Sequence, residues 1–450
     1  MKDKKFLVII GGGIFLFVVL ILILVLSTRG GSNTQPANKE QEKKSITLTW
    51  WGFEEKEAIE ALIKEYQQKN PEIKINYIQK DKNSLERYQN EINEAIANKE
   101  APDIWMIRQD WLPYNYKKLE PIPDSVIKKE DYEKKFFPIV KSTMTIKKDN
   151  EEKIYGIPFS VDSLILIYNE KIFREADASL EITTWEDFGK AISDITKRDG
   201  KEIELAGAAI GTAYNINYAF DILSLLMLQN GTEMVSENQK EATFNLTNSK
   251  DNKNYYPGTA ALEFYTSFAL PKKKYYTWNN SMKNSQELFI KGKVGMIFGY
   301  LEDYWKIKKK APKLNVGILP MPQTAPDVNI NYVRFWANVV SKDSSYREEA
   351  WNFLKFCLDK EIINKYYDYK KEKSEAIISS MPEIAENYTN NPENKIIINQ
   401  AKTAQDWYKG NVLKMEKLFL SMINNVNKGQ PAQLSIDSCA KKANTILNQK

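Results

Sequence analysis

The amino-acid sequence predicts an α/β protein of two or more lobes that follows a single N-terminal transmembrane helix. Three observations support this prediction: an uncharged apolar run at residues 6–26, strands that alternate with helices after residue 45, and a length of 450 residues. A chain of this length usually divides into two or three domains. Strands that alternate with helices through short turns form parallel sheets with helices on their faces.

The N-terminal segment indicates where the protein resides. Three lysines within residues 1–5 precede the apolar run 6–26, which as a helix would extend about 30 Å and cross a bilayer. The apolar core of a cleavable signal peptide is shorter, about 7–15 residues. We therefore expect a cytoplasmic stub (1–5), an uncleaved transmembrane anchor (6–26) and a flexible polar tether (27–44), with the body on the extracytoplasmic side of the cell membrane. Cleavage near Gly30 or Gly31 is the alternative.

Composition excludes several classes of function. The sequence contains no histidine, which rules out a His-based zinc site and a Ser-His-Asp triad. The formal net charge is +5, with basic and acidic residues interleaved, so no nucleic-acid-binding face is expected. Cys357 and Cys439 lie in helical patterns and are expected to be small buried residues, although a disulfide between them is permitted outside the membrane.

The first elements of the body follow one another closely. Apolar periodicity predicts two strand–helix pairs and a third strand, at 46–51, 54–68, 70–78, 84–98 and 101–107. A second set begins with "YGIPFSVDSLILIYNEKIF" and includes a helix at "TTWEDFGKAISDITKR", where Thr184 is the expected N-cap. Further strands are predicted at 294–300 and 315–322, and the chain is mainly helical after Pro382.

Aromatic and charged residues follow two of the predicted strands. "WWGF" (50–53) ends the first strand and "IRQDW" (107–111) follows the third. Ligands of open parallel sheets bind beyond the carboxyl ends of the strands, so both clusters are expected on one rim. Glu54, Asp110 and Arg108 add charges beside the rings. The alternative for either cluster alone is ordinary aromatic packing.

Several motifs occur in an order that is characteristic of one family. They are "APDIWMI", "YGIPFSVDSLILIYNEKIF", "TTWEDF", "FIKGKVGMIFGY" and "FWANVVSKDSSYREEAWNFLKF". With these motifs, residues 45–450 resemble the extracellular solute-binding proteins of ABC importers, in particular the carbohydrate receptors related to maltose-binding protein.

The resemblance implies a two-lobed periplasmic-binding-protein-like fold with a cleft between the lobes. Lobe one would comprise residues 45–160 plus 331–377, and lobe two residues 161–330 plus 378–450. The chain would cross between the lobes at "PFSVDSL", "PMPQTAPDVNINY" and "EAIISSMPEI". Closure of the lobes on a ligand would be a hinge motion.

The resemblance also implies a site in that cleft, where rings stack on the apolar face of a pyranose and polar side chains bond its hydroxyls. Adjacent strand residues face opposite ways, so Trp50 could instead point into the sheet. For Asn215 and Asn217 the alternative is helix capping. For Trp336 and Trp407 it is packing between lobes. The expected ligand-binding residues are Trp51, Glu54, Arg108, Asp110, Trp111, Ser160, Asp162, Asn215, Asn217, Tyr300, Glu302, Phe335, Trp336 and Trp407.

The function that the resemblance implies is capture of a sugar or oligosaccharide and its delivery to the permease subunits of an ABC importer. We expect a monomer that touches the membrane through residues 6–26 and uses no metal or cofactor. One alternative is an anchored ligand-sensing receptor that has no permease. Another is a glycoside hydrolase, which needs two carboxylates roughly 5–10 Å apart; Glu54 and Asp110 are candidates, but they match binding positions of a non-catalytic family, so no enzyme activity is expected.

Overall fold

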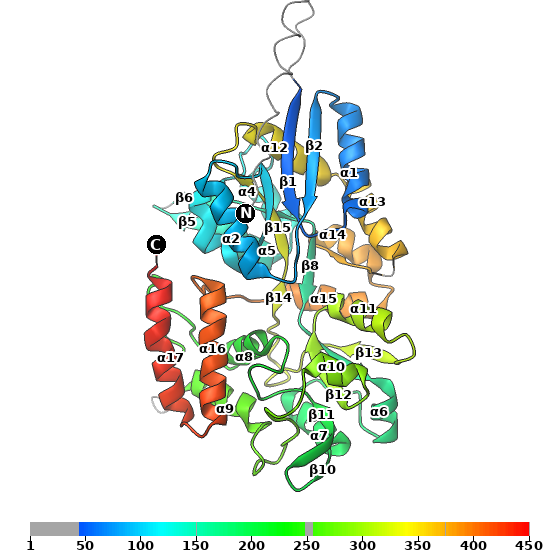
Figure 1. The fold of residues 1–450 in the computed structure, drawn as a ribbon, viewed down its shortest axis with the longest axis vertical. Coiled ribbons are helices and arrows are strands. Elements are labelled where there is room, and N and C mark those ends of the chain that lie inside the picture. Colours follow the sequence, from blue (N-terminus) through cyan, green and yellow to red (C-terminus); the bar gives the residue numbers. More distant parts are fainter. Residues whose placement is uncertain (1–44, 150, 248–254, 374, 450) are drawn as a thin grey trace, which may run out of the picture. The chain divides into compact units, whose positions relative to one another are not determined.

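The computed structural model of the protein describes residues 45–449 except 150, 248–254 and 374. The predicted cytoplasmic stub, transmembrane anchor and tether (1–44) lie outside the described residues. Within the described part of the chain, no helix is both long enough and apolar enough to cross a membrane. The elements are labelled in Figure 1.

The first sheet has six strands in the order β2-β1-β3-β15-β4, with β7 paired to β15. Its strands are β1 (Ile46–Gly52), β2 (Ile73–Gln79), β3 (Ile104–Arg108), β4 (Leu119–Glu120), β7 (Ile157–Pro158) and β15 (Trp336–Ser341). β1 runs parallel to β2 and to β3, which confirms the arrangement predicted for the first three strands. β15 comes from a distant part of the chain and pairs antiparallel with β3, so the sheet is mixed.

Helices cover this sheet through apolar faces. They include α1 (Lys56–Lys69), α2 (Leu85–Ala97), α12 (Arg347–Cys357) and α13 (Lys360–Glu372). The buried residues of α1 are Ala58, Ile59, Leu62 and Tyr66, at the three-to-four spacing of an amphipathic helix. Trp50 of β1 is fully buried and makes edge contacts with Tyr77 and Phe353. Of the two orientations considered for Trp50, the structure has the one that points into the core.

The second sheet has five strands in the order β10-β11-β12-β9-β13. They are β9 (Ile165–Asn169), β10 (Lys197–Asp199), β11 (Glu202–Ala208), β12 (Val294–Gly299) and β13 (Val316–Leu319). β11 and β12 are parallel, whereas β9 is antiparallel to both β12 and β13. The strands predicted at 294–300 and 315–322 are therefore confirmed.

Six helices accompany this sheet in sequence: α6 (Glu170–Glu175), α7 (Trp185–Ile195), α8 (Ala219–Gln229), α9 (Pro257–Ser267), α10 (Ser285–Ile290) and α11 (Leu301–Lys310). Thr184 caps α7 as predicted. Its hydroxyl accepts a hydrogen bond from the amide of Asp187 (3.2 Å), and the Asp187 carboxylate accepts one from the amide of Thr184 (3.1 Å). This reciprocal pair satisfies two amides that the first turn would leave free.

A small three-stranded sheet joins the segments that run between the two larger sheets. It consists of β14 (Val333–Arg334), β8 (Ser160–Ser163) and β16 (Ile378–Ser379), in the order β14-β8-β16. Along the chain, β8 lies between β7 of the first sheet and β9 of the second, and β14 lies between β13 and β15; β8 and β14 are labelled in Figure 1. All three strands lie within or directly after the segments where the family resemblance expects crossings. Their antiparallel pairing holds these distant segments together.

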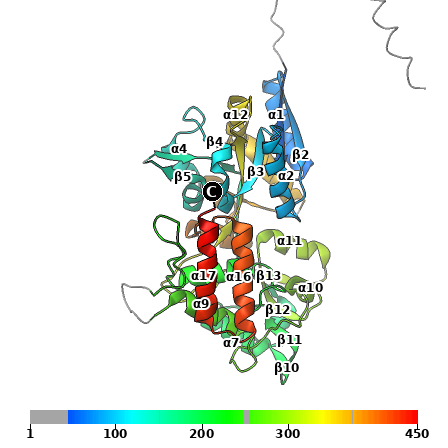
Figure 2. The same cartoon turned by 60° about the vertical axis from the view of Figure 1, so that its left-hand side comes forward.

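The C-terminal part is helical, as predicted: α14 (Pro382–Ala385), α15 (Pro392–Lys402), α16 (Val412–Asn427) and α17 (Ala432–Leu447). α16 and α17 lie side by side (Figure 2), and Phe419 of α16 packs against Phe220 of α8. Cys357 and Cys439 are buried and free. Shorter elements are η1 (Gln109–Trp111), α3 (Leu112–Asn115), η2 (Tyr116–Lys118), α4 (Lys129–Lys135), α5 (Pro138–Met144), β5 (Thr145–Lys148), β6 (Glu151–Ile154) and η3 (Glu386–Tyr388).

Candidate functional site

A buried ion pair lies at the carboxyl end of β3. Arg108 donates two hydrogen bonds to the Asp110 carboxylate, from Nε to Oδ1 (2.7 Å) and from Nη2 to Oδ2 (3.0 Å). The side chains are only 3% and 4% exposed. Burial by itself would raise the pKa of Asp110, but the charges of Arg108 and of Lys409, whose Nζ is 3.8 Å away, hold it below its ordinary value. Asp110 is therefore ionised at neutral pH.

Two further side chains connect this ion pair to distant segments. Lys409 is buried and forms an ion pair with Asp406. Gln109 donates from Nε2 to the carbonyl oxygen of Val333 (3.0 Å) and to Asp406 (3.4 Å), and its Oε1 accepts from the amide of Phe335 (3.1 Å). The end of β3, the segment from β14 to β15 and the segment before α16 therefore meet at one place.

A second cation lies on β14. Arg334 pairs with Asp221 of α8 (Nη2 to Oδ1, 2.6 Å), and the Tyr300 hydroxyl donates to the other Asp221 oxygen (2.6 Å). The guanidinium carbon is 5.1 Å from the ring centroid of Tyr218 and 5.5 Å from that of Tyr300. The Arg334 side chain is 21% exposed, whereas Asp221 is 1% exposed. The Arg334 side chain is thus held in place without being fully enclosed.

The backbone beside this cation is strained. Tyr218, the residue before α8, has φ +62° and ψ +23°, in the left-handed region. Bulky side chains rarely adopt this conformation, which costs of order 1–3 kcal/mol. The Tyr218 ring is partly exposed and contacts the Tyr300 ring edge-on, with centroids 4.9 Å apart. Strain of this kind often accompanies a functional site.

An aromatic cluster follows the ends of β1 and β3. Phe53 and Trp336 have ring centroids 4.4 Å apart, and Trp336 contacts Trp111 edge-on at 5.4 Å. Phe53 also contacts Tyr88 at 4.6 Å. Trp111 and Tyr88 are buried, whereas Phe53 and Trp336 are partly exposed. Phe53 and Trp336 are therefore the rings of this cluster that a ligand can reach.

Trp51 and Glu54 lie outside this aromatic cluster. The Trp51 ring is partly exposed, and the Nζ of Lys80, which pairs with Glu91 (2.5 Å), lies 3.8 Å from its centroid. Glu54 pairs with Lys370 of α13 at 3.3 Å. Both predicted residues therefore already have a charged partner within the protein.

Asp162 occupies the middle strand of the three-stranded sheet. Its carboxylate accepts hydrogen bonds from the amides of Leu301 (3.0 Å) and Glu302 (3.3 Å), at the start of α11. Burial raises the pKa of Asp162 to about 7, against the effect of these two amides, which lower it. Glu302 is exposed and forms ion pairs with Lys82 and with Lys306 (2.6 Å). Ser160, on the same strand as Asp162, is partly exposed.

Asn215 and Asn217 hold loops together. The Asn215 amide donates to the carbonyl oxygens of two loop residues (both 2.9 Å), and Asn217 accepts from Asn284 (2.8 Å). No side chain caps α8, so helix capping, the alternative for the two asparagines, is wrong. Trp407 is buried, with its Nε1 donating to Ser224 of α8 (3.3 Å).

Some predicted residues converge and others do not. The residues joined by the contacts around Arg108 and Gln109 are Arg108, Asp110, Trp111, Phe335, Trp336 and Trp407. Tyr300 joins the neighbouring group through Arg334. The residues with separate partners are Trp51, Glu54, Asn215, Asn217 and Glu302.

Several residues of these clusters are absent from the predicted ligand-binding set, among them Tyr218, Asp221, Arg334 and Lys409, whereas Phe53 was noted only as part of "WWGF". Asp221 left a usable signal, because it is the only charged residue of the otherwise apolar helix "AFDILSLLMLQ", and a buried carboxylate needs a partner. Arg334 left a similar signal in "NYVRFW". No feature of the sequence near Lys409 predicts that this lysine, one of 64 basic residues, is buried.

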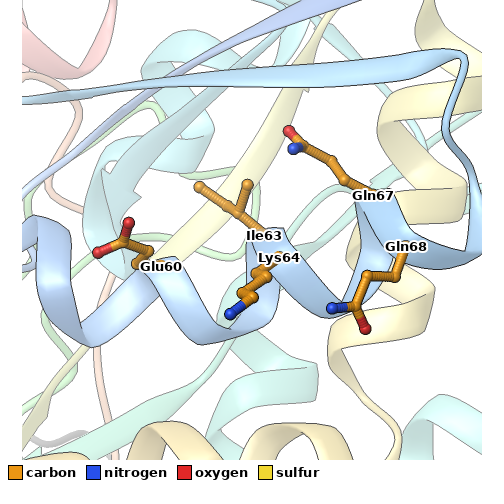
Figure 3. Close-up of a pocket in the computed structure, with 5 residues that line it drawn as sticks. All are labelled: Glu60, Ile63, Lys64, Gln67 and Gln68. Atoms are coloured by element: carbon orange, nitrogen blue, oxygen red, sulfur yellow. The ribbon is translucent and has the colours of Figure 1, made fainter.

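One hollow of the surface lies away from these clusters. A shallow groove of about 410 Å³ runs along α1 and is lined by Glu60, Ile63, Lys64, Gln67 and Gln68 (Figure 3). None of these residues belongs to the clusters above. Within the described residues, no group of three or more His, Cys, Asp or Glu side chains is placed to hold a metal ion.

One family model matches most of the chain. The family model described as "Bacterial extracellular solute-binding protein" matches residues 61–396, more than half of the chain. A putative binding protein of Brucella abortus (strain 2308) is 25% identical over 217 residues, which are 46% of this chain and 47% of that protein. The chain therefore matches about half the length of this curated relative.

Solved structures establish the fold. An ABC transporter solute-binding protein of Thermotoga lettingae, bound with α-D-tagatose, has a TM-score of 0.70 at 19% identity and covers 90% of this chain and 100% of its own. An ABC substrate-binding protein of Listeria monocytogenes in complex with cycloalternan has a TM-score of 0.69 at 18% identity, with the same coverage of both chains. The two-lobed α/β fold expected from the sequence is therefore confirmed.

Proposed function

Since the chain belongs to the bacterial extracellular solute-binding protein family, we propose that it captures a sugar or oligosaccharide and delivers it to an ABC importer. The observation that carries the proposal is the pair of reachable rings, Phe53 and Trp336, whose cluster adjoins a fixed, partly exposed Arg334. Rings of this kind stack on the apolar face of a pyranose, and a guanidinium donates hydrogen bonds to its oxygens. The sugar ligands of the solved relatives add support.

The residues in this proposal lie beside segments that can act as a hinge. Trp336 begins β15 and Arg334 lies on β14, one of the strands that run between the larger sheets. Closure would bring the rings of the first sheet and Tyr218, the residue before α8, onto opposite sides of the ligand. The lobes are assigned as 45–160 plus 331–377 and 161–330 plus 378–450. The other predicted residues, Trp51 and Glu54 among them, remain candidates for the outer parts of the ligand site.

Delivery requires partners outside this chain. We assign that role to the permease subunits of an importer, with the body held at the extracytoplasmic face by the segment 6–26. N-terminal sequencing of the mature protein tests the anchor: a start at Met1 supports it, and a start at or after Gly30 refutes it.

Ligand identity is tested by a thermal-shift screen of the full-length protein against neutral mono- and oligosaccharides, with amino acids, short peptides and polyols as comparison sets. A ligand that binds only the folded state raises the melting temperature in proportion to the logarithm of its concentration. The proposal expects such a shift from at least one carbohydrate. A shift from peptides alone, or from no carbohydrate at millimolar concentration, would contradict it.

A further inference from the structure

The buried cations of the candidate site are neutralised by the protein itself. Within the described residues, the pairs are Arg108 with Asp110, Lys409 with Asp406 and Arg334 with Asp221; farther out, Lys370 pairs with Glu54 and Lys80 with Glu91, and Lys82 and Lys306 share Glu302. Three of these pairs involve a side chain that is at most 4% exposed. No cation of these three pairs is free to meet an anionic ligand.

Arg334, the partly exposed cation of the buried clusters, is held by several groups at once. Arg334 donates one hydrogen bond to Asp221 (2.6 Å), and Asp221 also accepts one from the Tyr300 hydroxyl. The Arg334 guanidinium lies against the rings of Tyr218 and Tyr300. The remaining N–H groups can donate to sugar oxygens, but the charge they carry is already compensated by Asp221.

The cluster contains one more carboxylate than it has cations. Glu416 of α16 is partly buried, its pKa responds to the charges of Arg334, Asp221, Arg108 and Asp110, and it forms no ion pair within the described part of the chain. Burial is the main cause that raises the pKa of Glu416 above its ordinary value. The cluster therefore has four carboxylates, of Asp110, Asp221, Asp406 and Glu416, and three cations.

We infer that this site selects uncharged carbohydrates and rejects sugars that carry a carboxylate or phosphate, an inference that rests on the proposed function. An anionic group that enters the site loses hydration and meets no uncompensated cation, which leaves a buried charge without a partner. The surplus carboxylate of Glu416 repels it further. A neutral hydroxyl loses far less on leaving water and finds both donors and acceptors here.

The test compares sugars that differ only in charge. Maltotriose and mannotriose are titrated into the full-length protein by calorimetry, beside the same trisaccharides oxidised at C6, in which carboxylates replace hydroxymethyl groups. We expect a neutral trisaccharide to bind at least about 100-fold more tightly than its oxidised form, a difference of about 2.7 kcal/mol. Equal affinity for both forms would overturn the inference.

Two variants test the cause. Asp221→Asn keeps the shape of the side chain but frees the charge of Arg334, so the preference for the neutral sugar should fall at least about tenfold. Glu416→Gln removes the surplus carboxylate from a partly exposed position and should also reduce the preference for the neutral sugar. This variant keeps the test open if Asp221→Asn fails to fold. Glu263→Gln, which removes one negative charge from an exposed position on α9, should leave the preference unchanged.

The outcomes separate the two proposals. If the wild type binds a neutral trisaccharide and the folded variants keep the full preference for the neutral sugar, the inference alone is overturned. Failure of every neutral carbohydrate of the screen to bind would overturn the proposed function, and this inference with it.

Discussion

Replacement of Trp336 by alanine should weaken sugar binding far more than replacement of Trp51. Trp336 contacts Phe53 at 4.4 Å and Trp111 at 5.4 Å, and it is partly exposed, so one part of its ring packs and another can meet a ligand. Truncation of a central aromatic anchor typically costs at least about 2 kcal/mol of binding. That is about a thirtyfold rise in Kd.

The same variant also has a cost in stability. Two aromatic contacts worth about 0.5–1.5 kcal/mol each disappear with the ring. Because the ring is not fully buried, the total loss in the free energy of unfolding should stay near the lower end of the range for core aromatics, about 3 kcal/mol. A urea melt measures this loss, and calorimetric titration of the folded variant with the sugar found in the screen measures affinity.

Trp51→Ala is the matched control. It removes the same side chain from the same sheet, but its ring is covered by Lys80 at 3.8 Å. Loss of that cation–π contact costs about 0.5–1 kcal/mol of stability at a partly exposed position. Affinity should stay within about twofold of the wild type. The reverse pattern, with affinity lost in Trp51→Ala and kept in Trp336→Ala, would refute the reasoning and return the stacking role to Trp51.

Three further outcomes follow from the structure. Thr184→Ala removes the hydroxyl that accepts from the Asp187 amide and should lower the free energy of unfolding by about 1 kcal/mol in a urea melt, without changing sugar affinity. Burial raises the pKa of Asp162 from 3.8 to about 7. The folded state therefore keeps a proton that the unfolded chain releases, and the stability that Asp162 contributes falls as pH rises between these values. Urea melts at about pH 5 and about pH 8 should show this fall in the wild type and a smaller one in Asp162→Asn. Purified protein should leave bound oligosaccharide intact, because Glu54 is paired with Lys370 and Asp110 with Arg108. Steady release of reducing ends that Glu54→Gln or Asp110→Asn abolishes would establish a glycoside hydrolase instead.

Local features of the fold could be predicted because their causes are local. The apolar spacing of α1 and the capping threonine of α7 each depend on residues within a few positions, and both are confirmed. The insertion of β15 beside β3 could not be found this way, because its register pairs Trp336 with Arg108 across more than 200 residues. The three-stranded sheet was expected only as crossing segments implied by the family resemblance.

The candidate site was less predictable than the fold, for a related reason. Rings at strand ends were visible in the sequence, but which of them stays reachable depends on neighbours from elsewhere: Lys80 covers Trp51, whereas no lysine contact covers Trp336 among the described residues. The buried charges were harder still. Arg334 and Lys409 gain their environment only when distant segments meet, so their sequence neighbours say little about the pKa or exposure of either group.

The concentration of buried ion pairs has a meaning that stability does not explain. Removing two charges from water costs about as much as their attraction returns, so apolar residues of similar size could often replace such a pair with no loss of stability. The pairs instead impose geometry, because a guanidinium with two hydrogen bonds to one carboxylate can hold only one orientation. Arg108 with Asp110 holds the end of β3 in one conformation, and Arg334 with Asp221 ties β14 to α8, beside the strands that run between the two larger sheets. A site that must re-form each time a hinge closes needs polar groups that return to the same positions, and internally neutralised pairs provide them without attracting counter-ions. The network is thus better understood as the rigid polar base of the proposed ligand site than as a source of stability.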